Sequence, residues 1–412
     1  MQLIRACSVG AAAFGCAALV IGVAVPLAHA ADAPPAPDTP GKTVSPVVAK
    51  ASLDTTAYTD TDHVSVVTPV VSAEVGDREG AWKVHGQYLV DVISAASVDI
   101  VSTASQRWHE VRQAGNLGAG YKPKDFGADV SAAISREPDY HSIAGGGNLV
   151  WDFDDKNGTA LLGYSYDHDT IGRTGTPFSV YSHALAVHTL AGGITLTLNR
   201  AAVLALVSDV IIESGDQSKP YRYIPMFSPD VAPTIAKGAS ISVVNAERLP
   251  DRPLENLPDS RDRYSLTARF GYRFAHGTLR ADERLYTDTW RLHATTTELR
   301  YYANLSRRLM VWPLVRVHAQ NGVYFWSRAY VSQFGSGGFE LPTYRTGDRE
   351  LGPLFSITGG LGGSFGIGPA SDPSLLSIRA QADYVGTEFL DDLYVKSRGS
   401  VLGTLGLDGV FQ

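Results

Sequence analysis

The chain has 412 residues and a formal net charge of −7, with 42 acidic residues against 35 lysines and arginines. This mild acidic balance gives no basic surface for a nucleic-acid backbone, so binding to DNA or RNA is not expected. After residue 30 the longest apolar run, Ala201 to Val207, stops at Ser208. It is too short to cross a bilayer as a helix, which excludes a helical membrane protein.

The first thirty residues have the three parts of an export signal. Arg5 supplies the positive start, residues 9–26 form a small apolar stretch, and Ala28-His29-Ala30 is a small-x-small cleavage site. We therefore predict a signal peptide over residues 1–30 and a mature chain that begins at Ala31.

Two other interpretations of this segment fit the residues less well. Pro26 interrupts a membrane-spanning helix, and Phe14-Gly15-Cys16 lacks the leucine expected in a lipoprotein signal. Cleavage removes both cysteines, Cys7 and Cys16, and changes the net charge from −7 to −8 because Arg5 is lost. The mature chain then has no thiol for a disulfide, a metal site or a nucleophile.

The next segment, residues 31–60, begins with prolines and small residues, which favours an extended periplasmic tether. We predict that the folded domain follows it, over residues 61–412.

Strict alternation of apolar and polar residues predicts β-strands in that domain. In residues 262–274 the large apolar and aromatic side chains share one face, and arginine, serine and threonine share the other. Residues 308–320 repeat the pattern. With an export signal, such repetition predicts an all-β fold, a transmembrane antiparallel β-barrel whose outside meets lipid in the bacterial outer membrane.

About fourteen strands are expected, an allowed even number. Their ranges are 62–75, 81–94, 126–136, 140–154, 159–169, 180–198, 201–213, 262–275, 278–289, 291–304, 308–320, 350–365, 375–388 and 399–412.

The connections between these strands are of two kinds. Tight turns are expected at Lys156-Asn157-Gly158, His276-Gly277, Asn199-Arg200, Ser306-Arg307 and Gly368 to Pro373, and these would face the periplasm. Long polar loops at 170–178, 214–261, 321–349 and 389–398 alternate with them as extracellular loops. The long connection at 95–124 breaks the alternation, which indicates a miscounted strand near the start and leaves twelve or sixteen strands open.

The last segment places Val401, Leu405, Leu407 and Phe411 on one face. A final strand ending on an aromatic residue predicts recognition by the barrel-assembly machinery, although Gln412 follows Phe411 here. An ordinary amphipathic edge strand explains the same pattern equally well.

Several short motifs occur in an order that resembles one bacterial family. They include Trp82-Lys83-Val84-His85-Gly86-Gln87-Tyr88, Ser218-Lys219-Pro220-Tyr221-Arg222, Pro258-Asp259-Ser260-Arg261, Arg284-Leu285-Tyr286-Thr287-Asp288-Thr289-Trp290, and the tract Trp312 to Gln320. The similarity is to the family catalogued as domain of unknown function 3570, regarded as predicted outer-membrane barrels, over about residues 60–412. The resemblance implies a fold and a location, and no activity.

Alternation also predicts which charged side chains point into the barrel. The inward candidates are Arg263, Arg269, Arg273, Arg280, Asp282, Arg284, Asp288, Glu298, Arg300, Arg316, His318, Gln320, Arg379, Gln381 and Asp383. In a narrow barrel they would form ion pairs that plug the interior, because unpaired charge away from water is costly. In a wider barrel the arginine excess would line water and favour anions.

Two acidic clusters invite a metal-site interpretation that we set aside. In Asp167-His168-Asp169 the alternation puts His168 on the opposite face from its neighbours. In Asp152 to Asn157, Lys156 occupies a position where a calcium loop needs an acid, so a hairpin explains the residues better. We expect no metal and no cofactor.

Three functions remain open. The first is a channel for small polar or anionic solutes, in which the loops 214–261 and 321–349 gate entry and the inward arginines tune selectivity. The second is a hydrolase at the barrel rim, which is disfavoured because His85, His141, His183, His293 and His318 lie on separate segments without a nucleophile motif. The third is a plugged structural anchor. A siderophore-type receptor is excluded, because the chain is too short for a plug domain and twenty-two strands.

Overall fold

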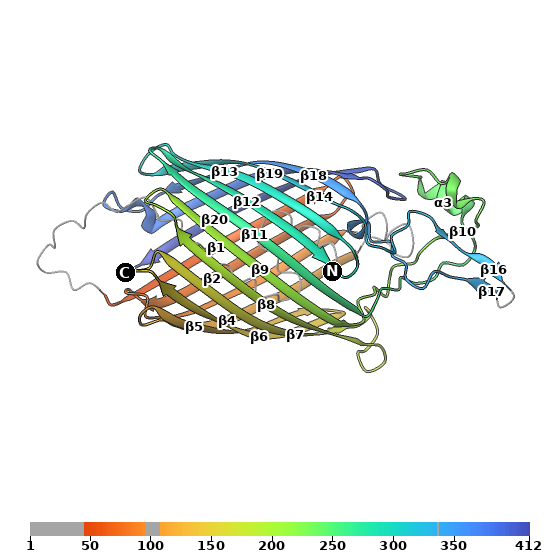
Figure 1. The fold of residues 1–412 in the computed structure, drawn as a ribbon, viewed down its shortest axis with the longest axis horizontal. Helices are drawn as coiled ribbons and strands as arrows, with labels where there is room; N and C mark the ends of the chain where they lie inside the picture. Colours follow the sequence, from red (N-terminus) through yellow and green to blue (C-terminus); the bar gives the residue numbers. More distant parts are fainter. Residues whose placement is uncertain (1–44, 96–107, 336–337) are drawn as a thin grey trace, which may run out of the picture.

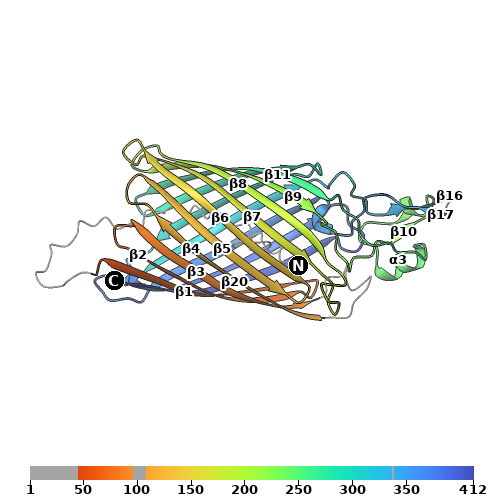
Figure 2. The same cartoon turned by 90° about the horizontal axis from the view of Figure 1, so that it is seen from below.

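The computed structural model describes residues 45–95, 108–335 and 338–412. The signal peptide predicted over residues 1–30, the cleavage before Ala31 and the first part of the tether lie outside these residues. Figures 1 and 2 show the folded chain in two views that differ by a 90° rotation.

Sixteen antiparallel strands form one closed barrel. Each strand pairs with the next one along the chain, and β1 pairs with β20 to close the sheet. In chain order the strands are β1 (Val47–Asp60), β2 (Ser65–Asp77), β3 (Trp82–Ala95), β4 (Trp108–Tyr121), β5 (Phe126–Glu137), β6 (Tyr140–Phe153), β7 (Gly158–Ile171), β8 (His183–Thr197), β9 (Ala202–Gly215), β11 (Ser260–Phe274), β12 (Gly277–Asp288), β13 (His293–Asn304), β14 (Leu309–Gln320), β18 (Leu354–Gly366), β19 (Leu376–Phe389) and β20 (Ser397–Phe411).

The outer face of the barrel is apolar. Leu117, Ile143, Leu361 and Leu405 are 60–65% exposed, although each is a large aliphatic residue in the middle of a strand. Their neighbours along each strand point inward and are mostly small or polar. This is the reverse of a water-soluble protein, and it is the pattern of a barrel whose outside is covered by hydrocarbon.

The short connections gather at one end of the barrel, which also holds the C-terminus (Figure 1). Each has a local chemical cause. Asp154, Asp155 and Lys156 take left-handed backbone angles of 50–68° in φ in the β6–β7 turn. Asn199 Oδ1 accepts from the backbone N–H of Ala201 at 2.8 Å in the β8–β9 turn. The tight turns expected from the sequence are therefore confirmed, and they lie at a single end.

The long connections lie at the opposite end, as expected from the alternation. They leave β7, β9, β14 and β19 and return as β8, β11, β18 and β20. The loop-rich end and the short-turn end are thus distinct in the structure, and we name them the long-loop end and the short-turn end.

The prediction of fourteen strands was wrong by two. All fourteen expected segments are strands, and the two missed strands are β1 and β4. In β4 the residues Gly115, Gly118 and Gly120 weaken the strand signal, because glycine is depleted in strands. This missing strand explains why the connection 95–124 broke the alternation.

The other missed strand, β1, corrects the boundary of the tether. The sequence predicts a tether over residues 31–60, whereas residues 47–60 form a full strand that hydrogen-bonds to both β2 and β20. Its outward residues are mainly alanine and threonine, with Leu53 as the one large apolar side chain at mid-strand. The alternation is therefore weak, and the barrel begins at Val47 rather than at residue 61.

The segments 216–259, 321–335, 338–353 and 390–396 build a folded unit at the long-loop end, which we name the cap. It contains the helix α3 (Ile241–Glu247), the parallel pair β10 (Met226–Phe227) with β15 (Tyr330–Val331), and the hairpin of β16 (Gln333–Gly335) with β17 (Gly338–Glu340). The cap extends beyond the barrel (Figures 1 and 2). No helix within the described residues is long and apolar enough to cross a membrane.

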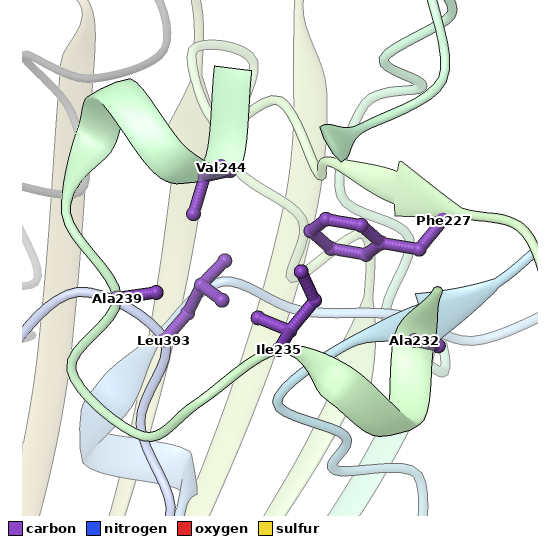
Figure 3. Packing of buried hydrophobic residues seen from close by; sticks show 6 residues of the cluster. All are labelled: Phe227, Ala232, Ile235, Ala239, Val244 and Leu393. Atoms are coloured by element: carbon purple, nitrogen blue, oxygen red, sulfur yellow. The ribbon is translucent and has the colours of Figure 1, made fainter. Parts of the chain in front are cut away.

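Packing inside the cap resembles that of a soluble domain. Phe227, Ile235 and Val244 of the β9–β11 connection bury their side chains against Leu393 of the β19–β20 connection (Figure 3). A second cluster joins Trp290 and Phe325 with Leu257 and Leu351. Trp326 and Tyr344 pack against this second cluster. The aromatic residues Phe325, Trp326 and Tyr344 of the β14–β18 connection thus pack within the cap.

Candidate functional site

The inner wall of β11 to β14 carries a concentration of arginines. Register pairing puts Arg269 opposite Asp282, Asp282 opposite Glu298, and Glu298 opposite Arg316. Because paired residues in neighbouring strands share a face, these four strands present one continuous charged surface. We name it the arginine wall. It consists of Arg261, Arg263, Arg269, Arg273, Arg280, Arg284, Arg300 and Arg316 with Asp282, Asp288 and Glu298.

Several of these arginines are held by carboxylates. Asp282 accepts from Arg280 Nη2 at 2.5 Å and lies 3.5 Å from Arg269 Nε. Glu298 accepts from Arg300 Nη2 at 2.9 Å, within its own strand. The interlocking expected for a narrow barrel is thus present in this part of the wall, both within and between strands.

Arg263 connects the arginine wall to the neighbouring strand β9. Its Nη2 donates to Glu213 Oε2 of β9 at 2.7 Å. Ser265 Oγ donates to Asp209 Oδ2 at 3.0 Å in the same pair of strands. The arginine–carboxylate contacts of the wall therefore continue across the seam between β9 and β11.

Two arginines of the wall stand apart from these pairs. Within the described residues, Arg273 and Arg284 have no carboxylate oxygen within 4.0 Å and both side chains are exposed. Arg273 lies near the short-turn end, and Arg284 lies in the long-loop half of β12. A charge on the inner wall that is exposed and not neutralised is available to a passing ion. Arg316 is less exposed and lies opposite Glu298.

Other predicted site residues have structural partners. Asp288 accepts from Arg261 Nη2 at 2.5 Å and from the backbone N–H of Leu292 at 2.9 Å, which fixes the β12–β13 turn. Gln320 donates from Nε2 to the carbonyls of Glu350 and Gly352 at 2.9 and 2.8 Å. Both side chains secure the junction of the barrel with the connections at its long-loop end.

His318 is held between two neighbours on the inner wall. Its Nδ1 lies 2.8 Å from Thr296 Oγ1, and its Nε2 lies 3.2 Å from Gln320 Oε1. This histidine belongs to the same junction as Gln320.

The wall of β18 to β20 carries balanced charge. Arg379 donates to Asp54 at 2.9 Å and to Asp408 at 2.8 Å, and so links β19 to β1 and β20. Asp383 accepts from Gln381 Nε2 at 2.7 Å. Asp383 lies directly over Gly360, where a Cβ would come within 1.9 Å of its carboxylate. Glycine is therefore needed there for side chains of β19 to fill the inner surface.

Sequence reasoning missed a second charged surface, on β5 to β9. Its inward acids are Asp129, Glu137, Asp152, Asp167, Asp169, Asp209 and Glu213. We name it the acidic wall. Alternation would have found it, because Asp167 and Asp169 are two residues apart in a strand that was correctly predicted.

The metal interpretation of this segment stays unsupported. His168 points outward and is exposed, as the alternation predicted, whereas Asp167 and Asp169 are buried on the inner face. No group of three or more His, Cys, Asp or Glu side chains suited to a metal ion occurs in the part of the chain that the structure describes.

One histidine at the long-loop end has the partner that a general base needs. His183 Nδ1 lies 3.0 Å from Asp216 Oδ2. Among the described residues, no hydroxyl group hydrogen-bonds to this histidine, so the third member of a catalytic triad is not in place. His85 Nδ1 lies 3.9 Å from Asp129 Oδ2. This histidine is on β3 near the short-turn end, far along the barrel from His183.

The loops expected to gate entry are held by buried charge. Glu255 accepts from Arg222 Nη1 at 3.1 Å and from Thr346 Oγ1 at 2.6 Å, and Asp348 lies 3.4 Å from the same arginine. Tyr330 donates to the carbonyl of Phe325 at 2.8 Å. Burial raises the pKa of Tyr330 to about 12. The cap is therefore a packed structure in which Arg222, Glu255 and Thr346 form a buried, paired polar cluster.

Two contacts fasten the cap to the rest of the rim. Arg349 Nη1 lies 2.6 Å from Asp62 in the β1–β2 turn, and Arg398 Nη1 lies 2.9 Å from Glu350. Both arginines are almost fully buried. The β14–β18 connection is thus tied to β20 and to the β1–β2 turn, on the two sides of the pair β1–β20 that closes the barrel.

Several solved structures align with this chain at low sequence identity. The siderophore receptor PirA from Pseudomonas aeruginosa aligns with a TM-score of 0.44 and 11% identity, over 89% of this chain and 62% of the receptor, so the chain spans less than two thirds of that protein. The outer membrane protein OprD from Pseudomonas aeruginosa aligns with a TM-score of 0.41 and 9% identity, over 89% of this chain and 95% of OprD. A bacterial polysaccharide outer membrane secretin aligns with a TM-score of 0.44 and 9% identity, over 89% and 98% of the two chains.

No curated protein matches the sequence. A family model does match it, over residues 104–369, which is narrower than the range of about 60–412 suggested by the motifs. This range includes more than half of the chain and strands β4 to β18. The chain therefore belongs to the family described as protein of unknown function, DUF3570.

Proposed function

We propose that this protein is a channel of the bacterial outer membrane that admits small polar solutes, with the arginine wall drawing in anionic groups. The observation that carries the proposal is the combination of an apolar outer face with a charged inner wall on which Arg284 is exposed and unpaired within the described residues. Lipid would cover the first surface, and water would fill the space beside the second.

The size of the barrel supports an open path. Small barrels of about eight strands are filled by their own side chains, whereas barrels of about 16 to 18 strands leave an aqueous channel. This chain has sixteen strands in its barrel. Ion pairs such as Arg300–Glu298 lie along the wall of this barrel.

The test is conductance of the purified, refolded mature protein in a planar bilayer, with a salt gradient to give the reversal potential. We expect discrete steps. Folding would be checked beforehand by the heat-dependent shift in electrophoretic mobility that intact barrels show. A folded barrel that stays silent contradicts the proposal and favours a plugged anchor.

One substitution connects the conductance to the arginine wall. Arg284→Gln should lower the permeability ratio of anions to cations by about two- to threefold, because unit charges roughly 7 Å apart in water interact by about 0.6 kcal/mol. Arg200→Gln, in the exposed β8–β9 turn, is the matched control and should change the ratio less. Equal effects of the two substitutions on the permeability ratio would mean that the arginine wall does not set the anion preference.

The proposal includes the route of assembly. Phe411 is 60% exposed at the end of β20, on the face that would meet lipid. We infer that the assembly machinery recognises this strand. Phe411→Ala should reduce the amount of folded barrel in the outer membrane without changing the conductance of the molecules that do assemble.

A further inference from the structure

Most charged side chains of the barrel strands point inward or lie at a strand end, and Glu283 of β12 is an exception. It pairs in register with Ala268 and Thr297, and it lies two residues before Leu285, which is 53% exposed on the outward face. Among the side chains that the structure describes, it is the one acid of a barrel strand that points outward more than three residues from both strand ends. A carboxylate at this place faces the hydrocarbon of the membrane, where charge is costly and points to a function.

Two threonine hydroxyls fix the position of this carboxylate. Thr295 Oγ1 and Thr297 Oγ1 donate to Glu283 Oε1 and Oε2, both at 2.5 Å, from the outward face of β13. Within the described chain, no lysine, arginine or histidine nitrogen lies within 4.0 Å of Glu283. The side chain is therefore held by neutral donors, and its charge has no counterpart there. We name the outward surface of β12 and β13 around Glu283 the acid face.

A second polar group points outward from β7 and β8. His188 pairs in register with Tyr166 and Ile212, which are 39% and 41% exposed on the outward face. Its Nδ1 lies 2.9 Å from Tyr164 Oη, and its ring lies 4.9 Å from the ring of Tyr166. Among the described side chains, His188 is the one basic residue of a barrel strand that points outward more than three residues from both strand ends. We name this surface the imidazole face.

The two faces lie at the same depth in the membrane. Counted from the short-turn end, Tyr164 is the seventh residue of β7 and Glu283 is the seventh residue of β12. The register agrees, because pairing leads from Tyr164 across β8, β9 and β11 to Thr287, four residues beyond Glu283 towards the long-loop end. Barrel strands tilt by about 35–45°, so a level line shifts by about one residue per strand, and the four strand steps account for these four residues.

The angle between the two faces decides which assemblies they fit. Strand β12 is three positions from β8 and four from β7 in a barrel of sixteen strands, which is about 70–90° around the circumference. In closed rings of three and four copies, the two neighbours of each copy lie about 60° and about 90° apart. A two-fold dimer would instead put each face against the same face of its partner, where like charges meet.

We propose that the acid face of one copy of this chain binds the imidazole face of the next, and that this contact repeats around a closed ring of three or four copies. The carboxylate of Glu283 accepts from the Tyr164–His188 pair of the neighbouring copy, so both polar groups are withdrawn from lipid. Their complementary chemistry at one depth identifies a second copy as the partner. Strands β9 and β11 lie between the two faces and surround the centre of the ring.

The test is photo-cross-linking in intact outer membranes. Leu190 of β8 lies opposite Tyr164 and is 45% exposed. p-Benzoylphenylalanine in its place should form adducts with a second copy on illumination, and mass spectrometry should place these adducts within residues 277–304, in β12 and β13. Leu53 of β1, 51% exposed on the far side of the barrel, is the matched control position and should form no adduct with a second copy.

Two results of this experiment would overturn the proposal. Adducts within β7 and β8 of the second copy would show a two-fold contact. The absence of any adduct with a second copy from the Leu190 position would remove the interface, provided that the heat-dependent shift in mobility shows a folded barrel.

Substitutions then test the polar contact itself, with light scattering in mild detergent to count the chains. Glu283→Leu and His188→Leu should each raise the concentration at which the ring dissociates by about tenfold or more. The double variant should do no worse than the stronger single variant, because both residues act through one contact. Glu388→Leu, which removes an exposed outward acid near the end of β19, is the control and should change this concentration less than about twofold.

A folded wild-type protein of one chain, or additive effects of the two substitutions, would overturn the contact. The outcomes also separate this inference from the proposed function, which it does not require. A ring that stays silent in the planar bilayer contradicts the channel alone, and a single barrel that conducts contradicts the ring alone.

Discussion

The barrel and the cap place the same kinds of residue in opposite positions. In the barrel, Leu361 and Leu405 face outward and the charges face inward, and the register of backbone hydrogen bonds holds the strands. In the cap, Phe227 and Leu393 lie inside a core, and charged groups are admitted only as buried pairs such as Arg222–Glu255. The surrounding medium decides which arrangement is stable.

This difference means that one type of substitution has opposite effects in the two regions. Removing a buried apolar side chain should damage the cap, because a cavity is left in a packed core. Removing an outward apolar side chain from the barrel leaves no cavity. Adding charge to the outward face is the damaging change there.

Breaking the buried charge cluster of the cap should have the largest effect. Glu255→Ala removes the carboxylate that accepts from both Arg222 and Thr346, and should cost about 3–5 kcal/mol of cap stability. Limited proteolysis within 216–259 would measure it, with the barrel remaining resistant. Asp391→Asn, which breaks the more exposed pair with Arg328, is the control and should cost about 0–1 kcal/mol.

The apolar core of the cap can be tested with two leucines from the same segment. Leu393 is 7% exposed in the first core cluster, and Leu390 is 52% exposed. Leu393→Ala should cost about 2–5 kcal/mol, whereas Leu390→Ala should stay within about 0.5 kcal/mol. Hydrogen exchange of the cap would report both. Similar values for the two variants would mean that the cap has no real core.

Adjacent residues of β20 test the two faces of the barrel. Leu405 points outward, and Thr404 points inward. Leu405→Arg should destabilise the barrel in lipid by about 2–4 kcal/mol, because it puts a charge near the middle of the hydrocarbon. Thr404→Arg should be tolerated. Urea unfolding in vesicles gives both values. A larger loss of stability for Thr404→Arg than for Leu405→Arg would contradict the assignment of the outward face to lipid.

The smallest effect concerns alkaline pH. Burial raises the pKa of Tyr330 to about 12, from 10.0. Below pH 10 the phenol is protonated in both the folded and the unfolded cap, and between about 10 and 12 only the unfolded form loses its proton. Cap stability should therefore fall by about 1–3 kcal/mol as the pH rises through this window. Tyr330→Phe should lessen that fall, as followed by tryptophan fluorescence.

The comparison also explains what could be predicted from the sequence. The period of two in β11, β12 and β14 predicted the three strands and the inward position of Arg269, Arg284 and Arg316. Alternation failed where the residues of one face carry little hydrophobic signal, as in the glycines of β4 and the alanines and threonines of β1. The cap has no period at all, because its core is assembled from distant loops.

The candidate site was predictable in part for the same reason. Alternation gives the face of a side chain and says nothing about its partners. It placed Asp288 and Arg284 on one face, yet the first is bound by Arg261 and the second is unpaired among the described residues. The pairing depends on rotamers and on neighbouring strands, which only the folded structure provides.

Cysteine accessibility in intact outer membranes tests the central claim most directly, that the barrel has lipid outside and water inside. Cys7 and Cys16 are the only cysteines of the sequence, and both precede the predicted cleavage site, so the mature background is free of thiols. We predict that a water-soluble maleimide labels single cysteines at Arg269 and Arg273 and spares those at Leu266 and Phe270. Equal labelling of the two sets would contradict the account.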